Sequence, residues 1–240
     1  SVVRPASAPR LLTSADQKLE LLEATGVDAV VIVPFDEQQA AESPESFVDR
    51  VLVRCLQTRV IVVGEDFHFG RQRDGNVDLL RKLGAEEDFD VEPVELIPRA
   101  DGVDEPVSST AIRRALAGGD IARANAMLGH PHEVRGLVFE GDQRGRLIGF
   151  PTANVAVPAG MCLPADGVYA GWYERPNGEV HPCAINLGRR PTFYEHADSS
   201  LLEAHLLDFD GDLYGESGKI RFVSFLRSER KFDGIDALVD

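Results

Sequence analysis

The sequence has few cysteines and no long apolar run. Its three cysteines, Cys55, Cys162 and Cys183, form no C-x-x-C pair and are too few for a disulfide framework, so neither a zinc ribbon nor a disulfide-stapled domain is expected. No apolar stretch approaches the ~18 residues that a membrane-spanning helix needs. The start of the printed chain shows no signal-peptide pattern, and we expect a cytoplasmic protein that does not bind membranes.

Basic residues are also scarce. The chain has 25 Lys and Arg against 40 Asp and Glu, which gives a net charge of −15. This charge disfavours broad binding to nucleic acid, because such binding depends on many contacts between cations and phosphates. A site for a single nucleotide is still compatible with it, since that site needs only local positive charge and often a metal ion. Otherwise the composition is globular, with 43% hydrophobic and 27% charged residues.

The first half of the chain alternates helix and strand signals. Ser14 with Gln17 forms a capping-box pattern, and Ser43 followed by Pro44 is typical of a helix start. Further helices are expected near residues 77–83, 109–117 and 120–128, and apolar, β-branched strands at 29–33, 59–64 and 91–96. This alternation predicts a doubly wound α/β module with a parallel sheet over residues 1–129.

The second half changes period. Short β-rich runs follow one another without intervening helices, which predicts an antiparallel barrel or sandwich over residues 130–240. The expected strands are residues 133–139, 155–157, 167–173, 181–187, 201–207 and 219–225, with a last helix beginning near residue 232.

A glycine-rich segment at residues 141–154 carries the strongest chemical signal. Its glycines let backbone N–H groups approach a ligand closely, its arginines supply local positive charge, and its Thr and Asn oxygens suit a hard cation such as Mg²⁺. On spacing alone, a glycine-rich hairpin turn with solvated arginines is the favoured interpretation of the segment. The residues concerned are Gly141, Arg144, Gly145, Arg146, Thr152 and Asn154.

The whole string resembles a known family. Gly-Phe-Pro-Thr-Ala-Asn at 149–154 is similar to the signature of riboflavin kinases, and further matching segments follow in the family's order over residues 130–240. These are Leu-Pro-Ala-Asp-Gly-Val-Tyr at 163–169, Asn-Leu-Gly-Arg-Arg-Pro-Thr-Phe at 186–193, Leu-Glu-Ala-His-Leu-Leu-Asp at 202–208, Asp-Leu-Tyr-Gly at 212–215, Phe-Leu-Arg at 225–227 and Lys-Phe-Asp at 231–233. The resemblance implies a six-stranded Greek-key barrel with a C-terminal helix.

The resemblance also implies roles for single residues. Thr152 and Asn154 would place Mg²⁺ against the phosphates of ATP. The preceding loop would cover the nucleotide through Gly141, Arg144, Gly145 and Arg146. Glu203 would accept the proton of the riboflavin 5′-hydroxyl, and Arg227 and Phe232 would lie near the flavin. Strand alternation alone puts Glu203 and His205 on one face and Leu202, Ala204 and Leu206 on the other.

The first half resembles the FMN adenylyltransferase module of bifunctional bacterial riboflavin kinase/FAD synthetases. Gly-Glu-Asp-Phe-His-Phe-Gly at 64–70 is similar to the family's flavin-side loop and implies flavin-binding roles for Asp66 and Phe69. The Ser-Ser-Thr string with a following arginine is similar to its nucleotide motif, and serines at a helix start favour an anion. The matching residues are Ser108, Ser109, Thr110 and Arg113.

One family segment has no counterpart here. The Gly-x-Phe-Asp-Gly-x-His-x-Gly-His string that binds the reacting phosphates is not found, because none of the six histidines stands in that pattern. We therefore expect the printed chain to make FMN from riboflavin and ATP, and the full-length protein also to adenylylate FMN to FAD. Two alternatives stay open: a flavin- or nucleotide-binding module without turnover, and a nucleic-acid-binding barrel, which the net charge disfavours.

Overall fold

The computed structural model describes residues 8–141, 150–189 and 200–229. Contacts divide the chain into two compact units. We call Thr25–Val107 the α/β unit, and Arg10–Ala24 together with the chain from Ser108 onward the barrel unit. The chain therefore contributes an early segment to the barrel unit before it builds the α/β unit.

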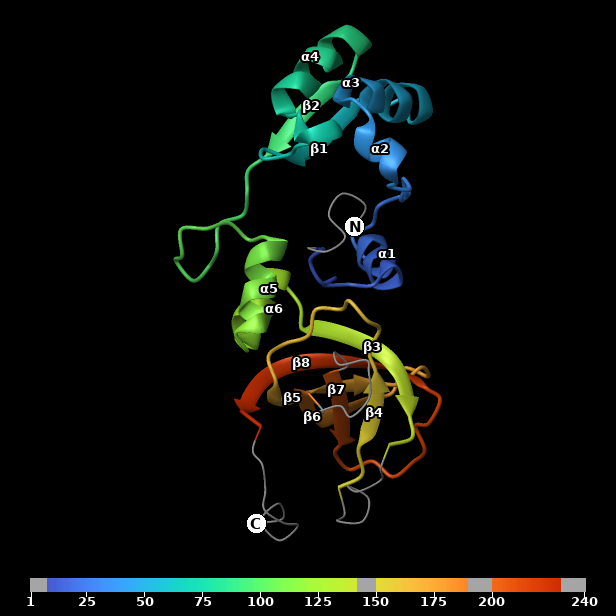
Figure 1. Cartoon of the computed structure of the whole chain (residues 1–240), viewed down its shortest axis with the longest axis vertical. Coiled ribbons are helices and arrows are strands. Elements are labelled where there is room, and N and C mark those ends of the chain that lie inside the picture. The colour runs from blue at the N-terminus through green and yellow to red at the C-terminus, as the bar shows by residue number, and fades with distance from the viewer. Residues whose placement is uncertain (1–7, 142–149, 190–199, 230–240) are drawn as a thin grey trace. The chain divides into compact units, whose positions relative to one another are not determined.

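The α/β unit contains a parallel pair of strands covered by helices (Figure 1). Strands β1 (Val60–Gly64) and β2 (Asp90–Val94) pair in parallel, as the pattern predicts. Its hydrophobic cluster contains Val48, Ile61, Phe69, Leu80 and Phe89. The helical segments are α2 (Glu37–Ala41), α3 (Pro44–Phe47), the π-helix η2 (Val48–Cys55), the 3₁₀ turn η3 (Arg71–Arg73) and α4 (Val77–Glu87).

The strand predicted over residues 29–33 does not form. These residues are irregular and largely exposed, and Ile32 is 69% exposed. In the described sheet β1 pairs with β2, and residues 29–33 join neither strand. A strand needs a neighbour for its backbone N–H and C=O groups, so an apolar, β-branched run without such a partner does not become one.

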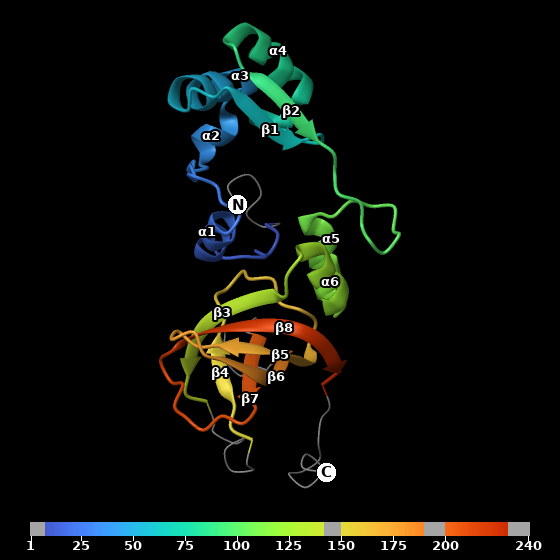
Figure 2. The same ribbon diagram turned by 180° about the vertical axis from the view of Figure 1, so that it is seen from behind.

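The barrel unit holds a closed six-stranded barrel with strand order β3-β4-β7-β6-β5-β8 (Figure 2). All its neighbouring strands are antiparallel, and the six runs predicted from the sequence are the six strands. Their bounds are β3 (His132–Phe139), β4 (Ala153–Ala156), β5 (Gly167–Glu174), β6 (Val180–Arg189), β7 (Ser200–Leu206) and β8 (Ser217–Arg227). The helix expected near residue 232 lies outside the described residues.

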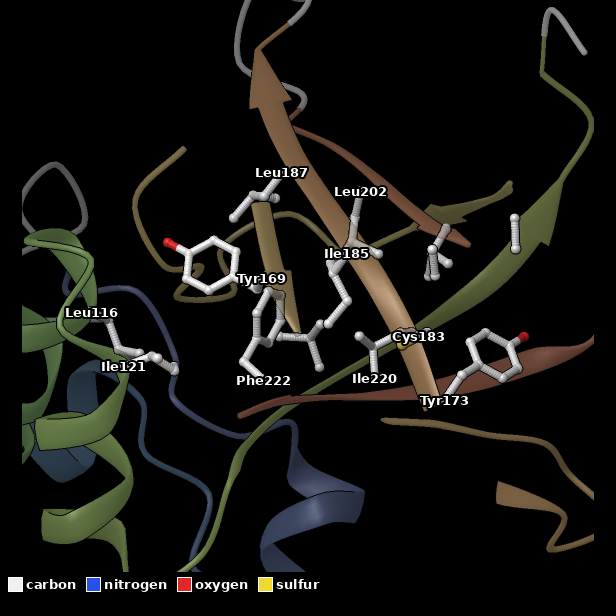
Figure 3. Close-up of a cluster of buried hydrophobic side chains, with 14 of the residues drawn as sticks. Leu116, Ile121, Tyr169, Tyr173, Cys183, Ile185, Leu187, Leu202, Ile220 and Phe222 are labelled. Atoms are coloured by element: carbon white, nitrogen blue, oxygen red, sulfur yellow. The ribbon is translucent and has the colours of Figure 1, made fainter. Parts of the chain in front are cut away.

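The barrel interior is filled by alternate residues of its strands (Figure 3). Leu202, Ala204 and Leu206 of β7 face inward, as strand alternation predicts. Tyr169 meets Phe222 edge to face, with ring centroids 5.2 Å apart, and donates its hydroxyl hydrogen to the Ala165 carbonyl. Burial raises the pKa of Tyr169 to about 12, so this phenol stays neutral and packs as part of the core.

Within the described residues the barrel unit has three helices, and each begins directly after a side chain that caps it. These are α1 (Ala15–Glu23) after Ser14, α5 (Ser109–Ala117) after Ser108 and α6 (Ile121–Leu128) after Asp120. In each case the capping side chain accepts a hydrogen bond from a backbone N–H of the first turn. The contacts therefore group α5 and α6 with the barrel, whereas the sequence pattern places them with the helix-strand alternation.

Helix α1 is tied to β3 by polar contacts. The Gln17 side chain donates to the Glu133 carbonyl at 3.1 Å, and the Arg135 guanidinium pairs with the Glu20 carboxylate at 2.6 Å. Gln17 is only 3% exposed, and its amide N–H group is buried without a large desolvation cost because Glu133 accepts from it. The segment before the Thr25–Val107 unit is thus a structural part of the barrel unit.

Candidate functional site

A cavity of about 230 Å³ lies in the barrel unit between β3, β4, β7 and the segment that joins β7 to β8. Most of its wall comes from two short stretches, residues 151–154 and residues 209–214. The remaining lining residues are Val138, Gly141, Ala204 and Leu206. The cavity thus brings together Gly141, Thr152 and Asn154, three of the residues that the sequence singles out.

Asn154 is a buried residue with an unused oxygen. It is 6% exposed, and its Oδ1 has no hydrogen-bond partner within the described part of the chain. A buried amide oxygen without a partner carries a desolvation penalty unless a ligand or ion meets it. Thr152 precedes β4 by one residue and lines the same cavity, so a hydroxyl and a carboxamide oxygen are available at this wall.

Gly141 is the residue that leaves room for this carboxamide. A β-carbon at position 141 would lie 2.4 Å from Asn154 Nδ2. This distance is well below van der Waals contact, so any side chain here would displace the amide. The absence of a side chain at Gly141 therefore leaves the room that the Asn154 carboxamide occupies.

Glu203 stands directly opposite Asn154 in the β4–β7 ladder. Side chains of directly opposed residues project from the same side of a sheet with Cβ atoms ~4.5–5.5 Å apart. Glu203 is half-buried and faces outward, away from the inward-facing Leu202 and Ala204. The Nδ1 atom of His205, on the same face, lies 2.8 Å from the Pro151 carbonyl oxygen, and its ring meets Phe150 edge to face.

The wall at residues 209–214 is a part of the site to which the sequence reasoning assigns no role. It carries the Phe209 ring and the carboxylates of Asp210 and Asp212. The Asp212 side chain accepts a hydrogen bond from the Tyr214 backbone N–H at 2.9 Å, which fixes the turn. Two signals were available in the sequence: the family-like Asp-Leu-Tyr-Gly string at 212–215 and the Asp-Phe-Asp-Gly-Asp run at 208–212.

Several predicted residues fall elsewhere. Arg144, Gly145, Arg146 and Phe232 lie outside the described residues. Arg227 is the last residue of β8, is exposed, and donates from Nη1 to the Ser228 carbonyl at 3.3 Å. The candidates for holding the metal, Thr152 and Asn154, therefore lie near the candidate base, Glu203. The two arginines of the glycine-rich segment are outside the described residues.

The predicted nucleotide motif of the adenylyltransferase lies at the start of α5. Ser108 caps the helix and accepts from the Ala111 N–H at 3.2 Å, while Ser109 and Thr110 are exposed. Arg113 donates from Nε to the Arg10 carbonyl at 2.6 Å. The exposed hydroxyls at a helix N-terminus are in keeping with an anion site. The Arg113 side chain instead ties α5 to the segment at Arg10 through its hydrogen bond.

The predicted flavin-side residues of the adenylyltransferase, Asp66 and Phe69, lie in the other unit. Asp66 is exposed, and its carbonyl oxygen lies 2.7 Å from His68 Nδ1. Phe69 is 8% exposed and packs in the hydrophobic cluster, with Phe67 stacked on it at 5.5 Å between ring centroids. Phe67 is 37% exposed, and the sequence analysis assigned it no role.

In the described part of the chain, no three side chains from His, Cys, Asp and Glu gather in a way that could hold a metal ion. None of the helices in the described ranges has the length and apolar character needed to cross a membrane.

Two family models match the chain. The riboflavin kinase model matches residues 128–240, and the FAD synthetase model matches residues 1–111. The first match contains the barrel strands and the cavity. The second contains the α/β unit and reaches into α5.

Curated relatives match almost the whole chain. The bifunctional riboflavin kinase/FMN adenylyltransferase of Listeria monocytogenes is 37% identical over 230 residues, which cover 96% of this chain and 71% of the relative. The protein of the same description from Escherichia coli K12 is 40% identical over 235 residues, covering 96% and 72%. A crystal structure described as a macrolide-efflux protein of Streptococcus pneumoniae is similar with a TM-score of 0.85 and 29% identity, over 95% of this chain and 71% of that one.

Proposed function

The chain belongs to the family of bifunctional riboflavin kinase/FMN adenylyltransferases, and from this premise we propose that its barrel unit transfers the γ-phosphate of ATP to the 5′-hydroxyl of riboflavin, giving FMN. The observation that carries the proposal is the cavity beside Asn154. A buried amide oxygen without a partner in the described part of the chain and a threonine line this cavity, and Glu203 is the strand partner of Asn154 in the β4–β7 ladder.

The oxygen atoms of Thr152 and Asn154 are suited to Mg²⁺. Both are neutral oxygen donors, and Mg²⁺ in nucleotide sites is held by few protein oxygens together with phosphates and water. The free Asn154 Oδ1 is the observation that fits such an ion. When bound, Mg²⁺ supplies charge neutralisation to the phosphates of ATP.

The wall at residues 209–214 supports the nucleoside part of ATP. Phe209 offers an aromatic surface, and the carboxylates of Asp210 and Asp212 can accept hydrogen bonds from hydroxyl or amino groups. Carboxylates are poor neighbours for bare phosphates, so the polyphosphate belongs at the Thr152 and Asn154 side of the cavity. Gly141, Arg144, Gly145 and Arg146 complete the proposed nucleotide site on the strength of the family resemblance.

Glu203 is the proposed proton acceptor. The riboflavin 5′-hydroxyl oxygen attacks the γ-phosphorus, the bond from that phosphorus to the bridging oxygen breaks, and ADP leaves with the electron pair. The hydroxyl proton passes to the Glu203 carboxylate as the new P–O bond forms. Because Glu203 stands opposite Asn154, the base and the phosphate-side donor are held by one ladder of paired strands. Arg227 and Phe232 remain the proposed flavin-side residues.

The family also includes adenylylation of FMN to FAD, which we assign to the region matched by the FAD synthetase model. Asp66 and Phe69 are its proposed flavin-side residues, and Ser108, Ser109, Thr110 and Arg113 its proposed nucleotide residues. A division of the two modules at residues 129 and 130 is proposed for the same reason, with α1 serving the barrel structurally.

Separation of the flavins by chromatography tests the proposal. The chain is incubated with riboflavin, ATP and Mg²⁺, and FMN is expected as a product. FAD in addition would show that the printed chain also carries the adenylyl transfer. Bound riboflavin or ADP without any FMN would contradict the kinase and favour a binding module without turnover.

A further inference from the structure

The cavity wall at residues 209–214 is held at both of its ends by one arginine of the β5–β6 hairpin. Arg175 directly follows β5, and its guanidinium donates to the two carboxylate oxygens of Glu216, from Nη2 at 2.6 Å and from Nε at 3.1 Å. The Cζ atom of the same group lies 5.4 Å from the centre of the Phe209 ring. Phe209 begins the wall and Glu216 follows its end, so Arg175 links the two.

The guanidinium is itself fixed from its own hairpin. Its Nη1 donates to Glu179 at 2.7 Å, and the backbone N–H of Arg175 donates to the Glu179 carbonyl at 2.8 Å. The Arg175 side chain is only 20% exposed. A planar group with two carboxylate partners has a defined orientation, which the flexible ammonium of lysine does not reproduce.

The Phe209 ring has a second fixed neighbour. The His181 ring of β6 meets it edge to face, with centroids 4.9 Å apart and an interplanar angle of 65°. Gly211 leaves space for the same ring, because a β-carbon there would lie 2.6 Å from the Phe209 Cζ atom. Phe209 is therefore held by Arg175 and His181 where it borders the cavity.

We propose that Arg175 is a positioning residue for nucleotide binding, which sets the place of Phe209 and of the wall that follows it without touching the ligand. Arg175 is not among the residues that line the cavity. The inference rests on the proposed function, because it takes the ligand of this cavity to be ATP. Its effect falls on ATP binding, since neither Glu203 nor Arg227 is among the residues that line the cavity.

Arg175→Met in the full chain tests the proposal, with Arg135→Met as the matched control. The Arg135 side chain is similarly buried, with 23% of it exposed, and it pairs with both carboxylate oxygens of Glu20. It is not among the residues that line this cavity. We expect Arg175→Met to raise the KM for ATP and the Kd for ADP about tenfold, with kcat and the KM for riboflavin within about twofold. Arg175→Lys should keep most of this increase, and Arg135→Met should show none of it.

A double variant separates positioning from general damage to the fold. If Arg175 acts through Phe209, Arg175→Met should add less than about twofold to the ATP KM of Phe209→Leu. Fully additive effects, or equal ATP constants for the Arg175→Met and Arg135→Met proteins, would overturn the inference while leaving the kinase proposal intact. A wild-type chain that neither binds ADP nor forms FMN would overturn both.

Discussion

The space above the backbone of Gly141 is occupied by the carboxamide of Asn154. A β-carbon at position 141 would lie 2.4 Å from Asn154 Nδ2 and 3.0 Å from Oδ1. Because Gly141 has no side chain, the buried Asn154 amide can occupy this space, and its Oδ1 remains available to a ligand. The contact joins Gly141, in the glycine-rich segment, to a residue 13 positions later in the sequence.

Gly141→Ala should therefore weaken ATP binding. The new methyl group must displace the Asn154 amide, and we expect the KM for ATP to rise about tenfold, as for loss of one hydrogen bond to a charged group. Steady-state kinetics with varied ATP measures this. Gly118→Ala is the control, because a β-carbon there meets its nearest atom at an ordinary 3.5 Å. An unchanged KM for ATP in the Gly141→Ala protein would contradict a role of this glycine in the nucleotide site.

Loss of the Asn154 oxygen should change the metal dependence of the reaction. In Asn154→Ala the Mg²⁺ concentration for half-maximal rate should rise about tenfold, and Thr152→Ala should act in the same direction. Asn154→Asp keeps an oxygen donor and should retain a Mg²⁺ requirement closer to that of the wild type. Titration of the rate with Mg²⁺ at fixed ATP gives the answer. Equal Mg²⁺ titration curves for the wild type and the three variants would contradict the proposal that Thr152 and Asn154 hold the metal.

His132 should make the barrel unit less stable in mild acid. Its ring is 1% exposed, and burial lowers its pKa to about 4 despite a contact at 2.9 Å between Nε2 and the Cys162 carbonyl oxygen. The ordinary pKa is 6.5, so between pH 6.5 and 4 the unfolded chain gains a proton that the folded chain does not. Stability is present above pH 6.5 and falls by about 3 kcal/mol as the pH drops to 4.

Denaturant unfolding at several pH values measures this loss. Tryptophan emission reports on the barrel unit, because Trp172 of β5 is the single tryptophan of the sequence. His132→Gln should flatten the dependence of the unfolding free energy between pH 6.5 and 5, whereas the exposed His68→Gln should leave it unchanged. A wild-type slope in the His132→Gln protein would assign the acid sensitivity to other groups.

The capping box of α1 should contribute to barrel stability. Ser14 Oγ accepts a hydrogen bond from the Gln17 backbone N–H at 3.2 Å, and Gln17 Oε1 accepts one from the Ser14 backbone N–H at 2.8 Å. Ser14→Ala removes the first of these bonds and should lower the unfolding free energy of the barrel unit by about 1 kcal/mol. The same fluorescence titration measures it. An unaffected barrel would mean that α1 detaches before the barrel unfolds.

The barrel could be read from the sequence because its determinants are local. Strand alternation along residues 201–207 separates Glu203 and His205 from Leu202 and Ala204, and burial follows that separation. Capping residues such as Ser108 and Asp120 likewise fix helix starts within a few positions. These features depend on neighbours in the sequence, so a single sequence contains them.

The features that were missed depend on distant partners. The apolar run at residues 29–33 has the composition of a strand, but pairing decides whether it becomes one. Arg175 pairs with Glu216, which follows it by 41 residues in the segment between β7 and β8, and charge in the sequence does not indicate which acid an arginine will meet. Phe67 and Phe69 differ in exposure because only Phe69 reaches the cluster around Leu80.

The proton acceptor is the most direct point at which to test the kinase account. Glu203→Gln keeps the size of the side chain and its place opposite Asn154, but cannot accept the proton. In one preparation, the rate of FMN formation and the binding of ADP with Mg²⁺ should be measured together. The account predicts an FMN rate lower by about 10²–10⁴-fold with ADP affinity unchanged. FMN formation at the wild-type rate would contradict it.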